Sequence, residues 1–199
     1  GFIIGGQFYY GTINLGEEKI LDNCGGEDIM IAKYDSEGKA QWGKVIGGNQ
    51  TDIITSLIET SDGNILVGGF FQSSSIDLGN GVILNNTNNS LTYRYGMIIK
   101  YNSQGEAQWA DNTKGDFDEI NSLVETNDGG YMATGYIWKS YMLNNGQCLN
   151  SNGESRYSGI IIKYNVEGNV QFAKSIMTEK KGSSHDVFYK SLIETNKGD

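Results

Sequence analysis

The chain has 199 residues, 28 glycines, no proline and a formal charge of −9 at pH 7. This acidic balance disfavours nucleic acid and anionic membrane surfaces as partners. No apolar run approaches the roughly 18 residues that a membrane-spanning helix needs, and the first residues lack the pattern of a signal peptide.

Three sequence landmarks recur in one order along the chain, which predicts a repeat. The first is the Ser-Leu-Ile-Glu-Thr stretch at 56–60, which returns with one change at 122–126 and unchanged at 191–195. The second is an apolar-Lys-Tyr triplet at 32–34, 99–101 and 162–164. The third is Gly-x-x-Gln-aromatic at 38–42, 105–109 and 168–172. The landmarks divide the chain into units at about 1–52, 53–118 and 119–186, followed by 187–199.

The middle unit shows the pattern of four short strands, which we expect at 56–60, 65–71, 95–101 and 106–110. Apolar residues alternate or run continuously within these segments, and turn residues bound them. No window shows a sustained helical period. Four antiparallel strands in a repeated unit are typical of a propeller blade, so we predict an all-β protein built as a β-propeller.

The two ends of the chain read as parts of one blade. Residues 1–52 supply its last three strands, and 187–199 supply its first strand. Three blades are too few for a ring, because propellers contain roughly four to eight. The pattern therefore predicts two copies joined head to tail in a six-bladed homodimer, while a fragment of a longer propeller is the alternative.

The stretch at 26–71 resembles the bacterial β-propeller repeat called SBBP. The resemblance rests on Glu27-Asp28 with Lys33, the turn at 35–38, Gly47-Gly48 with Asp52, and Asp62-Gly63-Asn64 followed by Gly68-Gly69. The order of strands also resembles NHL propellers. The resemblance implies a propeller in an exported or surface protein with a binding or scaffolding role, and it transfers no catalytic residue.

The connections at one end of the blades are long and differ between units. Those between the second and third strands span 11–27, 72–94 and 139–157, and those between blades span 47–52, 111–118 and 178–186. Within the first group, Ile76, Leu78, Val82 and Leu84 surround Asn80-Gly81, the signal of a small hairpin. Long loops on a rigid scaffold are the usual place for binding, so we expect a site at this end.

Aromatic side chains gather where the second strand of each blade ends. Tyr9, Tyr10, Trp138 and Tyr141 are the candidates for contact with a protein or glycan partner. Phe8, Phe70 and Tyr136 are expected instead in the core between blades.

Asp52, Asp118 and Asp186 each precede a first strand, and we predict that their side chains cap the loop backbone. Calcium binding by these loops is the alternative. The stretches at 76–81 and 114–119 offer oxygen ligands, although neither has the spacing of an EF-hand. Cys24 and Cys148 lack metal-binding spacing and are expected as thiols.

No motif indicates catalysis or a cofactor. His185 is the only histidine, and the chain contains no phosphate-binding loop and no cysteine–histidine cluster. We therefore predict a non-catalytic propeller scaffold, without metal or other cofactor, that binds a protein or a glycan at the cell surface or outside the cell. A lectin-like propeller and a glycan hydrolase with a carboxylate pair are the alternatives.

Overall fold

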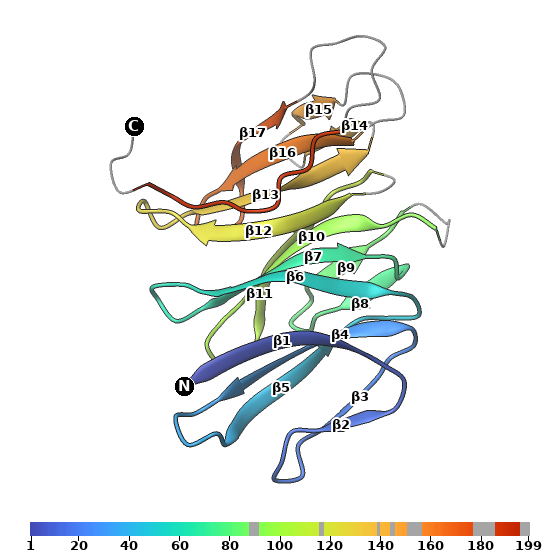
Figure 1. Cartoon of the computed structure of the whole chain (residues 1–199), viewed down its shortest axis with the longest axis vertical. Helices are drawn as coiled ribbons and strands as arrows, with labels where there is room; N and C mark the ends of the chain where they lie inside the picture. Colours follow the sequence, from blue (N-terminus) through green and yellow to red (C-terminus); the bar gives the residue numbers. More distant parts are fainter. Residues whose placement is uncertain are drawn as a thin grey trace.

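The computed structural model describes residues 1–87, 92–115, 118–138, 140–143, 146–150, 157–176 and 186–195. Every regular element in these residues is a β-strand, and every strand pair is antiparallel (Figure 1). The described residues contain no helix that is long and apolar enough to cross a membrane. The prediction of an all-β protein is therefore confirmed.

Three larger sheets follow one another along the chain. The first has the order β1-β4-β5 and consists of β1 (Phe2–Tyr9), β4 (Glu27–Tyr34) and β5 (Ala40–Ile46). The second has the order β6-β7-β10-β11 and consists of β6 (Asp52–Glu59), β7 (Ile65–Phe71), β10 (Tyr95–Tyr101) and β11 (Ala107–Asn112). The third has the order β12-β13-β16-β17 and consists of β12 (Glu119–Glu125), β13 (Tyr131–Trp138), β16 (Tyr157–Tyr164) and β17 (Val170–Ile176).

A small two-stranded hairpin lies in each long connection within a sheet. The hairpins are β2 (Thr12–Asn14) with β3 (Ile20–Asp22), β8 (Ser75–Asp77) with β9 (Ile83–Asn85), and β14 (Ser140–Met142) with β15 (Cys148–Asn150). In the middle hairpin, Ile76 and Leu84 are buried and join the core. These ribbons therefore extend the packing of the sheets as well as bordering the loops.

Tight turns join the first two strands of the second and third sheets. In the β6–β7 turn, the N–H of Gly63 donates to the Thr60 carbonyl, and Gly63 has a φ of +77°. Gly129 has the same place in the β12–β13 turn, with a φ of +79°. Both turns require this left-handed conformation, which glycine adopts without steric cost.

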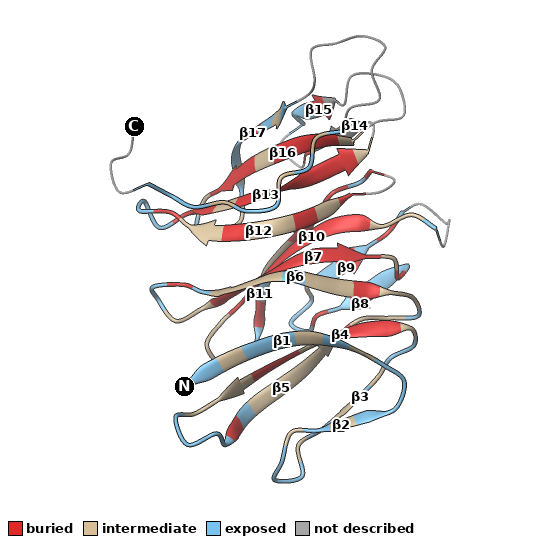
Figure 2. Ribbon diagram, viewed as in Figure 1, coloured by how far each residue is buried: buried red, intermediate tan, exposed pale blue. Residues whose placement is uncertain are grey.

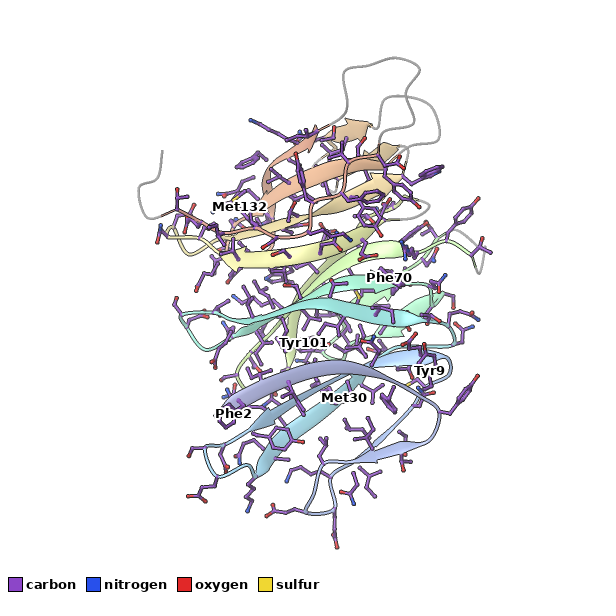
Figure 3. The ribbon with its side chains drawn as sticks, viewed as in Figure 1. Phe2, Tyr9, Met30, Phe70, Tyr101 and Met132 are labelled. Atoms are coloured by element: carbon purple, nitrogen blue, oxygen red, sulfur yellow. The ribbon has the colours of Figure 1, made fainter. Side chains whose placement is uncertain are left out.

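The sheets stack face to face, and the inner strands of the second sheet are buried (Figure 2). Apolar side chains fill the two spaces between the sheets. One core cluster joins the first and second sheets and includes Ile31, Val67 and Tyr101. The other joins the second and third sheets and includes Leu66, Ile120 and Ile160. Figure 3 shows Tyr101 inside the stack, whereas Tyr9 points away from it. The two inner strands of the second sheet, β7 and β10, are buried along their whole length, which agrees with their apolar sequences, interrupted only by Lys100.

Residues 186–195 differ from the expected first strand of a blade. They form no regular strand, although they run alongside β12 (Figure 1). The side-chain amide of Asn121 donates to the Tyr189 carbonyl at 2.7 Å, and the Leu192 N–H donates to the Ser122 hydroxyl at 3.2 Å. Among the described residues, no strand pairs with this segment as β7 pairs with β6 and β13 with β12, which explains why it is not a regular strand. The rest of the predicted strand, 196–199, lies outside the described residues.

The other predicted strands agree with the structure with small differences. The strands expected at 65–71 and 95–101 match β7 and β10. The first strand begins four residues earlier than expected, at Asp52, and the fourth strand is Ala107–Asn112. The connection at 178–186 lies outside the described residues except for Asp186.

Candidate binding surface

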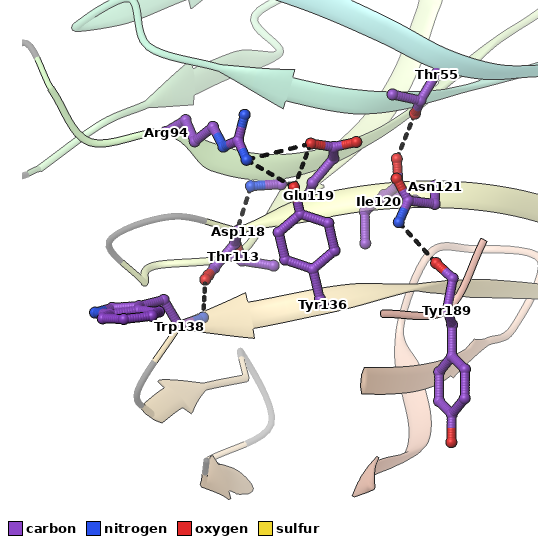
Figure 4. A network of polar contacts seen from close by, with 11 residues as sticks. Thr55, Arg94, Thr113, Asp118, Glu119, Ile120, Asn121, Tyr136, Trp138 and Tyr189 are labelled. Carbon is purple, nitrogen blue, oxygen red and sulfur yellow. Dashed lines mark hydrogen bonds and ion pairs between the residues drawn. The ribbon is translucent and has the colours of Figure 1, made fainter. Parts of the chain in front are cut away.

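The end of the stack that carries the long loops contains a polar clamp between the second and third sheets (Figure 4). Arg94 precedes β10, and its Nη2 donates to the Tyr136 hydroxyl at 2.6 Å. The same hydroxyl donates to Oε2 of Glu119 at 2.6 Å, and Arg94 forms an ion pair with Glu119 at 3.5 Å. The guanidinium also lies 4.6 Å from the centroid of the Phe70 ring. These contacts fix the relative position of the two sheets at their loop ends.

The clamp is largely removed from water. Tyr136 is buried, and the side chains of Arg94 and Glu119 are 27% and 13% exposed. Burial raises the pKa of Tyr136, and its hydrogen bond to Glu119 raises that pKa further. The phenol therefore stays neutral and bridges the two charged groups. Because the charges of Arg94 and Glu119 are paired with each other, the clamp has a structural role and holds neighbouring side chains in place.

An aromatic ledge, formed by Trp138, Tyr157 and Phe188, lies beside the clamp. The Trp138 and Tyr157 ring centroids are 4.6 Å apart, and those of Tyr157 and Phe188 are 5.1 Å apart. Trp138 and Tyr157 are partly buried, whereas Phe188 is 43% exposed. Nζ of Lys190 lies 5.9 Å from the Phe188 ring centroid. Flat aromatic rings next to a cation can stack against a partner, and the polar atoms of tryptophan and tyrosine can hydrogen-bond to it.

Asp52 and Asp118 hold the loops around this end. The fully buried Asp52 carboxylate accepts hydrogen bonds from the N–H groups of Gly48, Gln72 and Ser73 and from the Ser73 hydroxyl. The buried Asp118 carboxylate accepts from the N–H groups of Gly115 and Trp138. Asp118 therefore connects the loop before β12 to the backbone of the ledge.

Asp186 lies one residue before the position that corresponds to Asp52 and Asp118. The N–H of Val187 donates to the Tyr157 carbonyl, as that of Asp118 donates to the Arg94 carbonyl. The exposed Asp186 carboxylate accepts from the N–H of Tyr157 at 3.1 Å. It therefore caps the start of β16 from outside the sheet.

The predicted aromatic candidates do not form one cluster. Tyr9 and Tyr10 are 63% and 77% exposed and lie at the end of β1, on the first sheet. A hydrogen bond with Glu27 raises the pKa of Tyr9. Trp138 belongs to the ledge on the third sheet. Tyr141 lies on β14, opposite Leu149, but its side chain is outside the described part.

Sequence analysis missed Arg94, Glu119, Tyr157, Phe188 and Lys190. One signal was available, because Arg94 and Arg156 are the only arginines of the chain and Arg94 directly precedes a predicted strand. The partners of Arg94 come from another sheet, at separations that local patterns do not reveal. Phe70 and Tyr136, expected in the core, are buried, and Phe8 is half-buried.

A separate concave region lies between β5 and the hairpin β8–β9. It is an open cleft of about 400 Å³ lined mainly by glycine, aliphatic residues, Lys44, Asp77 and Tyr101. Nζ of Lys44 lies 5.9 Å from the centroid of the Tyr101 ring. The cleft offers one charge of each sign and no paired carboxylates.

Within the described ranges, no group of three or more His, Cys, Asp or Glu side chains is placed to hold a metal. No disulfide joins Cys24 to Cys148 in this part of the chain. Comparison with known proteins finds neither a family model that matches the chain nor a similar curated protein.

Proposed function

We propose that the chain is part of a non-catalytic β-propeller that binds a protein or a glycan through the aromatic ledge of Trp138, Tyr157 and Phe188. The stacked antiparallel sheets support the propeller architecture, because the second and third sheets share one strand order and pack face to face. The resemblance to SBBP repeats further suggests a scaffold at the cell surface or outside the cell.

The single observation that carries this proposal is the ledge, held by the buried clamp of Arg94, Glu119 and Tyr136. Its aromatic rings are partly exposed but fixed from behind, so a partner would not have to order them. Large rigid aromatic groups next to a cation are characteristic of binding surfaces.

A protein partner fits the ledge better than a glycan recognised equally by every blade. The positions that correspond to Trp138 are Gln72 in the second sheet and Tyr9 in the first. A lectin-like propeller would use similar pockets in successive blades, and these residues differ. For hydrolysis, Asp118 and Glu119 are poor candidates because both carboxylates already accept internal hydrogen bonds.

The test is a binding screen of the purified chain against immobilised glycans and against proteins from an extracellular fraction, followed by variants. Trp138→Ala should weaken binding at least about tenfold, since interface aromatics of this kind contribute 2 kcal/mol or more. Ile83→Ala is the matched control, because Ile83 is an exposed apolar residue on β9, away from the ledge.

The screen also separates the alternatives. Loss of binding in Tyr9→Ala, with Trp138→Ala unaffected, would move the site to the first sheet and contradict the proposal. Release of reducing sugars from a glycan would replace it with the hydrolase alternative.

A further inference from the structure

The outer edge of the first sheet lacks a neighbouring strand in the part of the chain that the structure describes. β1 corresponds to β7 and β13, which pair with β6 and β12 on the side where β1 has no partner. Phe2, Ile4 and Tyr9 on this strand are 62%, 43% and 63% exposed. An unpaired edge with exposed apolar side chains is a template for another strand.

In the strands that correspond to β1, a glycine stands where the neighbouring first strand comes closest. A Cβ at Gly69 would lie 1.9 Å from the Ile53 carbonyl oxygen, and one at Gly135 would lie 1.9 Å from that of Glu119. In both sheets the close approach occurs at a register shift in the first strand. Gly6 has the same place on β1, yet a Cβ there would meet nothing within 4 Å. Glycine at position 6 therefore leaves room for a strand to approach β1 as closely as Ile53 approaches Gly69.

A groove lies where that strand would run. It has a volume of about 190 Å³ and is lined by residues 5–7 of β1 and 54–57 of β6. In the next layer, β12 contacts both β6 and β7. A strand added at the β1 edge would therefore contact β6 and fill this groove.

Residues 187–195 have the contacts that such a strand needs on its other side. The Leu192 N–H donates to the Ser122 hydroxyl, as the Leu123 N–H donates to the Ser56 hydroxyl. The Asn127 N–H donates to Glu194, as the Ser61 N–H donates to Glu125. The segment is therefore placed on β12 as β12 is placed on β6. It is a first strand that lacks its own second strand.

The fourth strands and their neighbouring turns give an independent indication. Nε1 of Trp42 donates to the Ser103 carbonyl, and the Trp42 ring packs on Gly105. Trp109 repeats this contact with the next sheet, donating to the Val166 carbonyl and packing on Gly168.

The series stops at both ends of the stack. Phe172, at the position of these tryptophans, is 42% exposed. Gly38, at the position of Gly105 and Gly168, has nothing within 4 Å of an added Cβ. One end of the stack thus offers an uncovered aromatic ring, and the other offers an uncovered turn.

We infer that residues 187–195 of one copy pair with β1 of a second copy, head to tail. The register of the other sheets puts Tyr189 opposite Gly6 and Ser191 opposite Gly5 of the second copy. Ser191 then accepts from the Leu57 N–H, and Phe172 covers the Gly38 turn. The same contact made reciprocally joins two copies into a closed pair. This inference shares Phe188 with the aromatic ledge, but it concerns the β1 edge, and the solution mass of the chain tests it separately from what the loop end binds.

The test is the solution mass of the full chain, measured by sedimentation equilibrium over a range of concentrations. The wild-type chain should form a species of twice the chain mass. Gly6→Val should weaken association at least about tenfold, because its side chain would collide with the backbone of the added strand. Its unfolding temperature at monomeric dilution should not fall, since the space is open in the single chain. That readout separates blocked pairing from misfolding.

Two matched controls sharpen the test. Thr12→Val places the same valine side chain at an exposed strand position away from the edge and should leave association unchanged. Phe172→Ala should weaken association, whereas Ile83→Ala, at another exposed apolar residue, should not. A wild-type chain that stays monomeric, one that forms only open polymers, or a Gly6→Val variant that associates like wild type would overturn the inference.

Discussion

The buried carboxylate of Asp52 makes stability depend on pH in a direction that a single substitution can test. Four hydrogen bonds from Gly48, Gln72 and Ser73 favour its charged form. Burial favours the neutral form and is the larger effect, so the pKa of Asp52 is raised from 3.8 to about 6. The folded protein therefore holds a proton at Asp52 more tightly than the unfolded chain does.

The sign of the effect follows from proton linkage. Between pH 3.8 and about 6 the folded state binds more protons at Asp52 than the unfolded state, so stability from this group falls as pH rises. The shift corresponds to about 3 kcal/mol, because one pKa unit equals about 1.4 kcal/mol. The stabilisation from Asp52 is fully present below about pH 3.8 and is lost as pH rises through about 6.

Asp52→Asn removes this titration while keeping the size of the side chain. Urea unfolding of both proteins at several pH values from 4 to 7 measures their difference in free energy of unfolding. We expect that difference to change by about 3 kcal/mol across the range, to the disadvantage of the wild type at higher pH. Asp77→Asn is the matched control, because Asp77 is an exposed carboxylate that also accepts a backbone N–H. Parallel pH curves for wild type and Asp52→Asn would refute the reasoning.

Two further predictions concern the second and third sheets. Gly69→Ala should lower the free energy of unfolding by about 1–3 kcal/mol in urea titrations, since its Cβ would lie 1.9 Å from the Ile53 carbonyl oxygen. Gly6→Ala, at the corresponding open position, should have no such cost at monomeric dilution, and equal effects there would contradict the assignment. Asp128 has a pKa held well below its usual range, chiefly by its hydrogen bond to Lys163. The contribution of Asp128 to stability is therefore present above about pH 4 and is lost as pH falls. In thermal unfolding, Asp128→Asn should lose less stability in acid than the wild type does. An unchanged acid profile would count against the role of the Asp128–Lys163 pair.

The strands could be predicted from sequence because local patterns determine them. The strands at 65–71 and 95–101 are apolar runs, interrupted only by Lys100, and both are found at the expected bounds. The first strand starts earlier than its Ser-Leu-Ile-Glu-Thr landmark because residues 52–54 also pair with β7, ahead of a register shift between Ile54 and Ser56. A shift of this kind depends on contact with the neighbouring strand, which a local pattern does not contain.

The candidate site could be predicted only in position. The long loops pointed to the end of the stack where Arg94, Glu119 and Tyr136 meet, but not to these residues. Tyr136 was expected in the core and is buried, yet its hydroxyl links two charged groups from different sheets. Phe188 reaches the ledge only because residues 186–195 run along β12. Such contacts arise from the stacking of sheets, so they lie beyond any single window of sequence.

Within the described residues, the two ends of the stack expose different apolar surfaces. The first sheet exposes a strand edge with Phe2 and Ile4, and the far end exposes Phe172 and Ile193, the latter 78% exposed. The second and third sheets meet through a serine hydroxyl, a glutamate and the fourth-strand Trp109. The fourth-strand Trp42 makes the same contact between the first and second sheets. An interface between unlike surfaces either closes into a ring or continues as an open filament. In the closed pair that we infer, these four apolar side chains would be buried, and the surface that could drive an open filament would be removed.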